Sequence, residues 1–311
     1  MALHTNTPLL SSRPLSIASN KTIWLKFDAL QPSGSFKIRG IGFACEHHLK
    51  CGKKRFVSSS GGNAGLAVAY AARCLGVPAT VVVPTSTSER AKDLLVQEGA
   101  KVIVQGNVWS EANEHALTLV SEDAAFIHPF DDPLLWKGHS TLIDEVVRDN
   151  VDFDCVVLSV GGGGLLSGVV EGLRQNGRMD VPVVAVETRG TDSLAQSLIA
   201  GENTTLPAIT SIASSLGASR VSDHAFRLAR SYPVYSHVVS DWDAVNACKR
   251  FLNDHRVLVE PACGASLALA YNAQRSRALQ DFRAPLIIVC GGVTATADQI
   301  NRWLEELAPQ S

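Results

Sequence analysis

The chain has 311 residues, which is enough for one large domain or for two smaller domains that share a cleft. Apolar residues make up 46% and charged residues 19% of the sequence, which is ordinary for a globular protein. The formal net charge of -2 gives no basic field for nucleic acid, and no apolar run reaches membrane-spanning length. Seven scattered cysteines without a C-x-x-C pair, and a start without a signal-peptide pattern, favour a cytoplasmic protein with reduced thiols.

Residues 55–123 predict strands and helices in alternation, which is typical of a parallel sheet covered by helices. RFVSSS at 55–60 and PATVVVP at 78–84 predict strands, and the segment 61–76 between them predicts a helix. Ser86 and Glu89 form a capping-box pattern that opens a helix over 88–99, and Gly99 ends it. A strand at 101–106 and a helix over 111–123 complete this series.

A second series of the same kind begins after residue 130. A helix over 141–150 leads to the strand DCVVLSV at 154–160, a run of glycines and another helix. VPVVAVET at 181–188 and APLIIV at 284–289 predict further strands. Two such series predict two α/β lobes, a large one from residues 1–30 and 134–311 and a small one from 31–133.

Three segments combine polar residues with turn signals. Pro32 to Lys37, PSGSFK, presents an aromatic ring and a lysine, although most lysines are simply solvated side chains. The loop 58–65, SSSGGNAG, joins a strand to a helix, so its N–H groups and hydroxyls could bind a carboxylate or phosphate. Helix capping explains the same residues about as well. Cys290-Gly291-Gly292 follows a buried strand, where a thiol either fills space or faces a ligand.

The fourth segment is the run Gly161 to Gly164 after the strand at 154–160. Successive glycines let the backbone approach an anion closely, and the dipole of the following helix points at that anion. No frame fits G-x-G-x-x-G and the Walker lysine is absent, so neither a dinucleotide site nor a P-loop is predicted.

Together these segments resemble the fold type II family of pyridoxal-phosphate enzymes, and within it the serine/threonine dehydratases. PSGSFKIRG resembles the cofactor-lysine motif, SSGGNAG the substrate-carboxylate loop, GGGGLL the phosphate cradle, and VCGG the strand end beneath the pyridine nitrogen. TPLLSSRPLS, HPFDDPLLWKGH and EPACGASLA also match in order. Cys290 in place of a serine, together with His139, resembles the catabolic, liver-type subgroup. The resemblance implies a two-lobed α/β fold of the tryptophan synthase β type, with the cofactor in the cleft between the lobes.

The resemblance also assigns a role to each matching residue. Lys37 would hold pyridoxal phosphate as a Schiff base and act as the acid/base at the substrate Cα, which suits a desolvated lysine of lowered pKa. Phe36 would pack against the cofactor ring, and Asn63 would hydrogen-bond its 3-hydroxyl. Ser60 and Gly61 would complete the catalytic set and, with Asn63, surround the substrate carboxylate. The phosphate would be held by the backbone amides of Gly161, Gly162, Gly163, Gly164 and Leu165.

Two further assignments concern the cofactor ring and a cation. Cys290 would face the pyridine nitrogen, and because a thiol carries no fixed negative charge, that nitrogen should stay largely unprotonated. Loss of a β-hydroxyl is then favoured over transamination. A monovalent cation, K+ or Na+, is implied at Glu187, with carbonyls from Thr191, Ser215, Leu216 and Ala218. A capping or ion-paired role explains Glu187 nearly as well.

The predicted function is therefore β-elimination from L-serine, L-threonine or both, giving pyruvate or 2-oxobutanoate and ammonia, by a homodimer. A serine racemase, a β-replacing synthase, a hydroxyaspartate dehydratase and a non-catalytic binding protein are the alternatives. Racemisation requires a second acid/base, usually a serine where this chain has Gly61, although Ser59 and Ser60 keep that alternative open. A hydroxyaspartate substrate would require a basic partner, such as Arg189 or Arg220. The sequence leaves serine against threonine open, and Gly61 predicts a roomy, permissive pocket.

Overall fold

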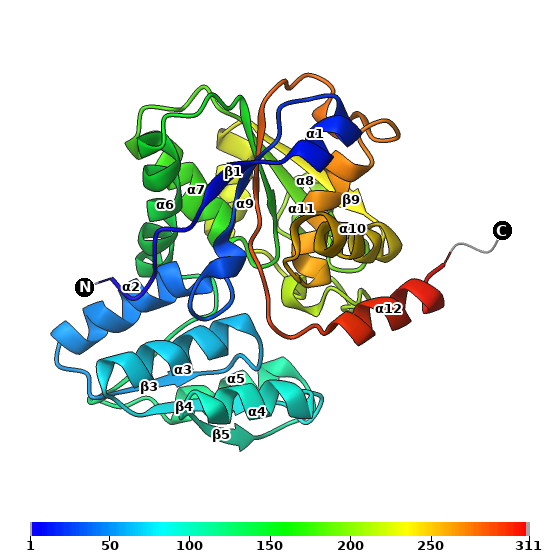
Figure 1. The fold of residues 1–311 in the computed structure, drawn as a ribbon. Coiled ribbons are helices and arrows are strands. Elements are labelled where there is room, and N and C mark those ends of the chain that lie inside the picture. The colour runs from blue at the N-terminus through cyan, green and yellow to red at the C-terminus, as the bar shows by residue number, and fades with distance from the viewer. Residues whose placement is uncertain (1, 309–311) are drawn as a thin grey trace.

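The computed structural model describes residues 2–308 and contains two sheets with helices on their faces (Figure 1). The larger sheet has the strand order β1-β2-β10-β7-β8-β9, and the smaller sheet has the order β5-β4-β3-β6. All neighbouring strands are parallel except the pair β1–β2. The α/β class and the parallel-type sheets predicted from the sequence are confirmed.

The strands and helices have the following bounds in chain order. The strands are β1 (Leu9–Ser11), β2 (Trp24–Lys26), β3 (Arg55–Ser58), β4 (Ala79–Val83), β5 (Lys101–Val104), β6 (Ala124–Phe126), β7 (Cys155–Ser159), β8 (Val183–Thr188), β9 (Val234–Val239) and β10 (Pro285–Ile288). The helices are α1 (Arg13–Ser19), α2 (Lys37–Lys50), α3 (Asn63–Leu75), α4 (Glu89–Gln97), α5 (Trp109–Thr118), α6 (Pro133–Arg148), α7 (Gly164–Gln175), α8 (Ser193–Ala200), α9 (Asp223–Ser231), α10 (Asp241–His255), α11 (Pro261–Tyr271) and α12 (Ala297–Glu306).

One predicted helix cap and one predicted helix start differ from the structure. The cap of α4 is Ser88, whose side chain accepts a hydrogen bond from the N–H of Ala91, so the capping-box pair of Ser86 and Glu89 was wrong. Helix α6 begins eight residues before the predicted position, because Asp132 caps it and Pro133 suits its first turn. In both helices, a single capping side chain decides where the helix begins.

Helix α2 connects the two sheets. It packs against α3, which covers the smaller sheet, and against α6, which lies beside the larger sheet (Figure 1). The strands β7 and β10 are buried along their whole length, so their carboxyl ends open onto loops inside the molecule. Ligand sites in parallel sheets form at these carboxyl ends. The serine loop after β3 and the glycines after β7 and β10 all occupy such positions.

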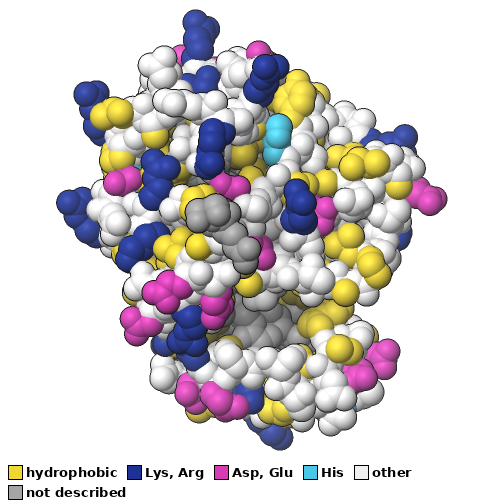
Figure 2. Space-filling model, turned by 90° about the vertical axis from the view of Figure 1, so that its right-hand side faces the viewer, with side chains coloured by type: hydrophobic (Ala, Val, Ile, Leu, Met, Phe, Trp, Pro, Cys, Tyr) yellow, Lys and Arg dark blue, Asp and Glu magenta, His cyan; other side chains and the backbone are white. Residues whose placement is uncertain are grey.

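Two observations concern possible binding partners, namely the surface charge and the apolar character of the helices. On the face drawn in Figure 2, basic and acidic side chains are interspersed rather than separated into fields. Among residues 2–308, no helix combines the length and the apolar character that crossing a membrane requires.

A buried ion cluster fixes the first turn of α2. The guanidinium of Arg39 binds both oxygens of Asp28, with Nε–Oδ2 at 2.6 Å and Nη2–Oδ1 at 2.8 Å, and both oxygens of Glu145 at 2.7 and 2.8 Å. Lys26 Nζ lies 2.6 Å from Glu145 Oε2 and 2.6 Å from the carbonyl of Thr7. The four charged side chains are buried, and the two cations balance the two carboxylates. Its bonds with Asp28 and Glu145 raise the pKa of Arg39 despite burial.

We expect Glu145→Gln to lower the free energy of unfolding by about 3–5 kcal/mol, because it leaves an uncompensated cation in a buried cluster. Urea denaturation of the purified protein measures this change. Asp123→Asn, which breaks the exposed pair with Arg55, is the matched control and should change the midpoint little. Equal losses in the two variants would contradict the central role of the cluster.

Candidate active site

Lys37 is the first residue of α2 and lies among groups from both sheets. Its Nζ donates a hydrogen bond to the carbonyl of Pro129 at 2.7 Å and lies 5.2 Å from the centre of the Phe36 ring. Burial lowers the pKa of Lys37 to about 8, although the nearby Cys290 and Glu260 act in the opposite direction. An amine of this pKa is partly neutral near neutral pH, so it can act as a nucleophile toward a carbonyl and as a base.

The lysine segment is attached to the loop after β10. The N–H of Phe36 donates to the carbonyl of Cys290 at 3.1 Å, and the N–H of Gly292 donates to the carbonyl of Gly34 at 2.9 Å. Gly34 has a φ of +75°, and a Cβ there would lie 2.0 Å from the side chain of Val293. The two motifs therefore meet because glycine allows a close approach of two backbones.

Cys290 ends this strand segment as a buried thiol. Its interaction with Cys263 and its burial raise the pKa of Cys290 well above its usual value. The group is therefore a neutral thiol and carries no negative charge at neutral pH. His139, the other residue typical of the liver-type subgroup, is fully buried on α6, with its ring centre 4.9 Å from that of Phe36.

The serine loop after β3 lies at the carboxyl edge of the smaller sheet. The hydroxyl of Ser59 donates a hydrogen bond to Asn113 Oδ1 on α5 at 2.8 Å, so this bond directs the hydroxyl toward α5. Ser60 Oγ accepts from the N–H of Gly62 at 3.3 Å. A Cβ at Gly61 would lie 2.8 Å from the methyl group of Thr87. The sequence predicted free space beside Gly61, and this was wrong in the Cβ direction, because Thr87 from the loop after β4 occupies it.

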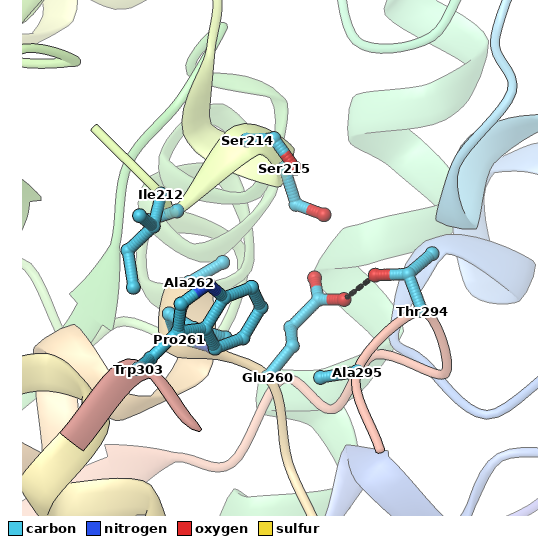
Figure 3. A pocket seen from close by; sticks show the side chains of 10 residues that line it. Ile212, Ser214, Ser215, Glu260, Pro261, Ala262, Thr294, Ala295 and Trp303 are labelled. Carbon is cyan, nitrogen blue, oxygen red and sulfur yellow. Dashed lines mark hydrogen bonds between the residues drawn. The ribbon is translucent and has the colours of Figure 1, made fainter. Parts of the chain in front are cut away.

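Asn63 begins α3 and reaches across to the other sheet. Its Nδ2 donates to Glu260 Oε1 at 2.6 Å, and its Oδ1 accepts from the N–H of Val293 at 3.3 Å. Glu260 precedes α11, and its other oxygen accepts from the hydroxyl of Thr294 at 2.7 Å. Glu260 and Thr294 line a cavity of about 20 Å³, where Ser215 and Thr294 point toward the carboxylate (Figure 3).

The sequence reasoning did not identify Glu260 as a site residue. The sequence does contain a feature that indicates a buried Glu260. This carboxylate stands between the apolar VLV and the helix-starting proline of EPACGASLA, where it has no obvious solvent-facing role. Thr87 was missed too, since nothing in its sequence neighbourhood relates it to the serine loop.

The glycine run at 161–164 fits a phosphate. Within residues 2–308, the backbone N–H groups of Gly161, Gly162, Gly163 and Gly164 donate no hydrogen bond to the protein. Gly163 has a φ of +89°, and a Cβ at Gly162 would lie 2.3 Å from the ring of Phe130. Unused N–H donors at the start of a helix, where no side chain fits, are suited to the phosphate of pyridoxal phosphate.

The residues predicted to bind a cation lie in different local environments. Both oxygens of Glu187 accept backbone bonds, from the N–H groups of Leu194 and Ala195 at 2.8 Å each, so the side chain caps α8. Burial raises the pKa of Glu187 to about 8. Ser215 and Leu216 lie in a short 3-10 turn at Ser214–Leu216, where the carbonyl of Leu216 accepts from the N–H of Ala218. Thr191 is buried and bonds to Thr188. In the described part of the chain, no cluster of three His, Cys, Asp or Glu side chains could hold a metal ion.

Comparisons with known proteins identify the family of this chain. Residues 1–291 match the family described as pyridoxal-phosphate dependent enzyme. The human L-serine dehydratase/L-threonine deaminase is 45% identical, with 98% of this chain and 96% of that protein covered. A fungal L-serine ammonia-lyase from Rhizomucor miehei has a similar structure, with a TM-score of 0.93, 35% identity and coverage of 98% of this chain and 99% of that one. Maize serine racemase also has this fold, with a TM-score of 0.88, 28% identity and coverage of 98% and 93%.

The resemblance inferred from the motifs is thus confirmed over nearly the whole chain. The lysine at the start of α2, the unused glycine N–H donors and the matching relatives agree with one another. The chain belongs to the family of pyridoxal-phosphate dependent enzymes.

Proposed function

We propose that this enzyme is an ammonia-lyase that converts L-serine, L-threonine or both to a 2-oxoacid and ammonia. The observation that carries the proposal is the partly buried Lys37 amine of lowered pKa, whose Nζ bonds the carbonyl of Pro129 beside the carboxyl ends of both sheets. The names of the human and fungal relatives support this reaction class. The family resemblance also supports a cytoplasmic homodimer that acts in amino-acid catabolism.

Each residue of the site has a proposed role in binding the cofactor, in binding the substrate or in proton transfer. Bound pyridoxal phosphate supplies an electron sink that acidifies the Cα proton of an attached amino acid. The N–H groups of Gly161 to Gly164 and Leu165 would hold its phosphate, Phe36 would pack against its ring, and Cys290 would offer the ring nitrogen a neutral thiol. Lys37 would anchor the cofactor and then remove the Cα proton of the substrate. Ser60, Gly61 and Asn63 would orient the substrate carboxylate.

Two alternatives from the sequence lose support in this geometry. Ser59, a candidate second acid/base for racemisation, donates its hydroxyl proton to Asn113. Arg220, a candidate partner for the extra carboxylate of hydroxyaspartate, is paired with Asp223 at 3.1 Å on the surface. Of the residues named for these alternatives, Ser59 and Arg220 are thus bonded elsewhere, whereas Ser60 and Arg189 keep both alternatives open.

The direct test is 2-oxoacid release by the cofactor-loaded protein from L-serine, L-threonine, D-serine and threo-3-hydroxyaspartate in parallel. We expect pyruvate from L-serine or 2-oxobutanoate from L-threonine, and we expect Lys37→Ala to abolish both because it removes the base and the anchor. Lys50→Ala, at the exposed far end of α2, is the matched control. Turnover retained by Lys37→Ala, or no 2-oxoacid from the wild type, would refute the proposal.

Gly61→Ala tests how the pocket discriminates between substrates. The added methyl group meets Thr87, so we expect the loop to shift toward the substrate side. The ratio of kcat/KM for L-threonine to that for L-serine should then fall by about tenfold or more, because one methyl group is worth about 1–3 kcal/mol. Adding Thr87→Ser, which removes the opposing methyl, should restore most of the ratio. Unchanged kinetics in Gly61→Ala would contradict this account.

We also propose a monovalent cation at Glu187, with carbonyls of Thr191, Ser215, Leu216 and Ala218 as further ligands. Burial raises the pKa of Glu187, so ionising it costs stability as the pH rises through about 8. A bound cation would offset that cost. We expect potassium to raise the melting temperature relative to tetramethylammonium at equal ionic strength, and by more at about pH 9 than at about pH 6. Equal melting temperatures in the two salts would count against the site.

A further inference from the structure

The side-chain amide of Asn63 lies between two partners of fixed polarity. On one side, Glu260 Oε1 accepts from Nδ2 at 2.6 Å, and an ionised carboxylate can only accept. On the other side, the backbone N–H of Val293 donates to Oδ1 at 3.3 Å, and a backbone N–H can only donate. The two ends of an amide are nearly identical in shape, so these two partners decide which way it faces.

Glu260 is itself held rigidly. It is 3% exposed, and its second oxygen accepts from Thr294 at 2.7 Å (Figure 3). The loop after β10 covers the carboxylate, and a Cβ at Gly292 would lie 2.0 Å from Glu260 Cδ. Gly292 also has a φ of +116°, which only glycine adopts readily. The backbone of this loop is thus shaped around the carboxylate.

We propose that Glu260 is a positioning residue that fixes Asn63 as a hydrogen-bond donor toward the ring oxygen of pyridoxal phosphate. The inference rests on the proposed function, in which Asn63 meets the 3-oxygen of the cofactor. One N–H of the amide is taken by Glu260, and the other has within the described residues only a long contact of 3.4 Å to Ser215. That second N–H is available to an oxygen acceptor, and a donor of this kind stabilises the ionised form of the 3-oxygen.

Burying a carboxylate at this position costs free energy, so its presence there requires an explanation. Burial raises the pKa of Glu260, and the bonds from Ser215, Thr294 and Asn63 only partly oppose this. The charged or titratable groups that face it are Lys37, Cys290 and Cys248. A glutamine would fill the same volume at lower cost, but it can present either an oxygen or an amino group. At this position only a carboxylate adds to the Val293 N–H a second partner that permits one orientation of Asn63 alone.

The contact also joins the two sheets. Asn63 belongs to α3 on the smaller sheet, whereas Glu260 directly precedes α11, which packs on the larger sheet, and Val293 lies in the loop after β10 of that sheet. The orientation of the amide therefore depends on the two sheets being correctly placed against each other.

The test compares wild type, Glu260→Gln, Asn63→Ala and the double variant by two readouts that need no turnover. These are the Kd for pyridoxal phosphate, from fluorescence titration, and the balance of the long- and short-wavelength absorption bands of the loaded protein, which reports ionisation of the ring oxygen. We expect each single variant to weaken binding about tenfold and to shift the balance toward the short-wavelength band. The double variant should add little to either single change, because both act through one bond.

The control is Asp154→Asn, which removes a partly buried carboxylate that accepts two backbone N–H groups at the amino-terminal end of β7. It should leave both readouts unchanged.

Glu260→Asp keeps the charge and withdraws it by one methylene, so it should behave as Glu260→Gln. It also serves as the test variant if the glutamine variant does not fold. Wild-type bands and affinity in Glu260→Asp or Glu260→Gln, or additive effects in the double variant, would overturn the proposal. Normal bands without any 2-oxoacid release would instead refute the proposed reaction and leave these readouts valid.

Discussion

The buried ion cluster of Arg39, Asp28, Glu145 and Lys26 is the constraint on which the site depends. Arg39 lies two residues after Lys37, on the same first helical turn of α2. Its two carboxylate partners come from a turn before the helix and from α6, so three segments meet at one guanidinium. Moving this turn would leave a buried charge without its partner, which is costly. The position of Lys37 is thus set by the charge balance of this cluster together with the backbone bonds between its segment and the loop after β10.

A second polar contact performs a similar task between the two sheets. The amide of Asn63 meets Glu260 and Val293 across the boundary, and Thr294 holds the far oxygen of the carboxylate. Apolar packing alone tolerates small displacements, but a 2.6 Å bond to a buried carboxylate does not. The site therefore rests on buried polar groups that link segments distant in sequence, while the glycine run at 161–164 keeps its N–H donors free.

In the proposed reaction, selectivity would depend on a contact between neighbouring loops of the smaller sheet. Gly61 lies in the loop after β3, and Thr87 lies in the loop after β4. The methyl group of Thr87 occupies the space where a residue-61 side chain would begin. The bond from Ser59 to Asn113 likewise draws its hydroxyl toward α5. The smaller sheet thus shapes the substrate side of the site by packing, while the larger sheet carries the glycine run and the thiol.

The sequence by itself determined the alternating α/β pattern and the four segments with Lys37, Asn63, the glycine run and Cys290, because periodicity and glycine placement are local properties. The resemblance of these segments to known motifs, in their order along the chain, pointed to the family. It misplaced the start of α6 and the cap of α4, where a single side-chain bond decides the boundary. Only the tertiary structure decided the partners of these motifs, namely Pro129 for Lys37, Glu260 for Asn63 and Thr87 for Gly61. The physical reason is that each partner comes from a segment whose distance in space depends on how two sheets and α2 pack together, and no local pattern encodes that distance.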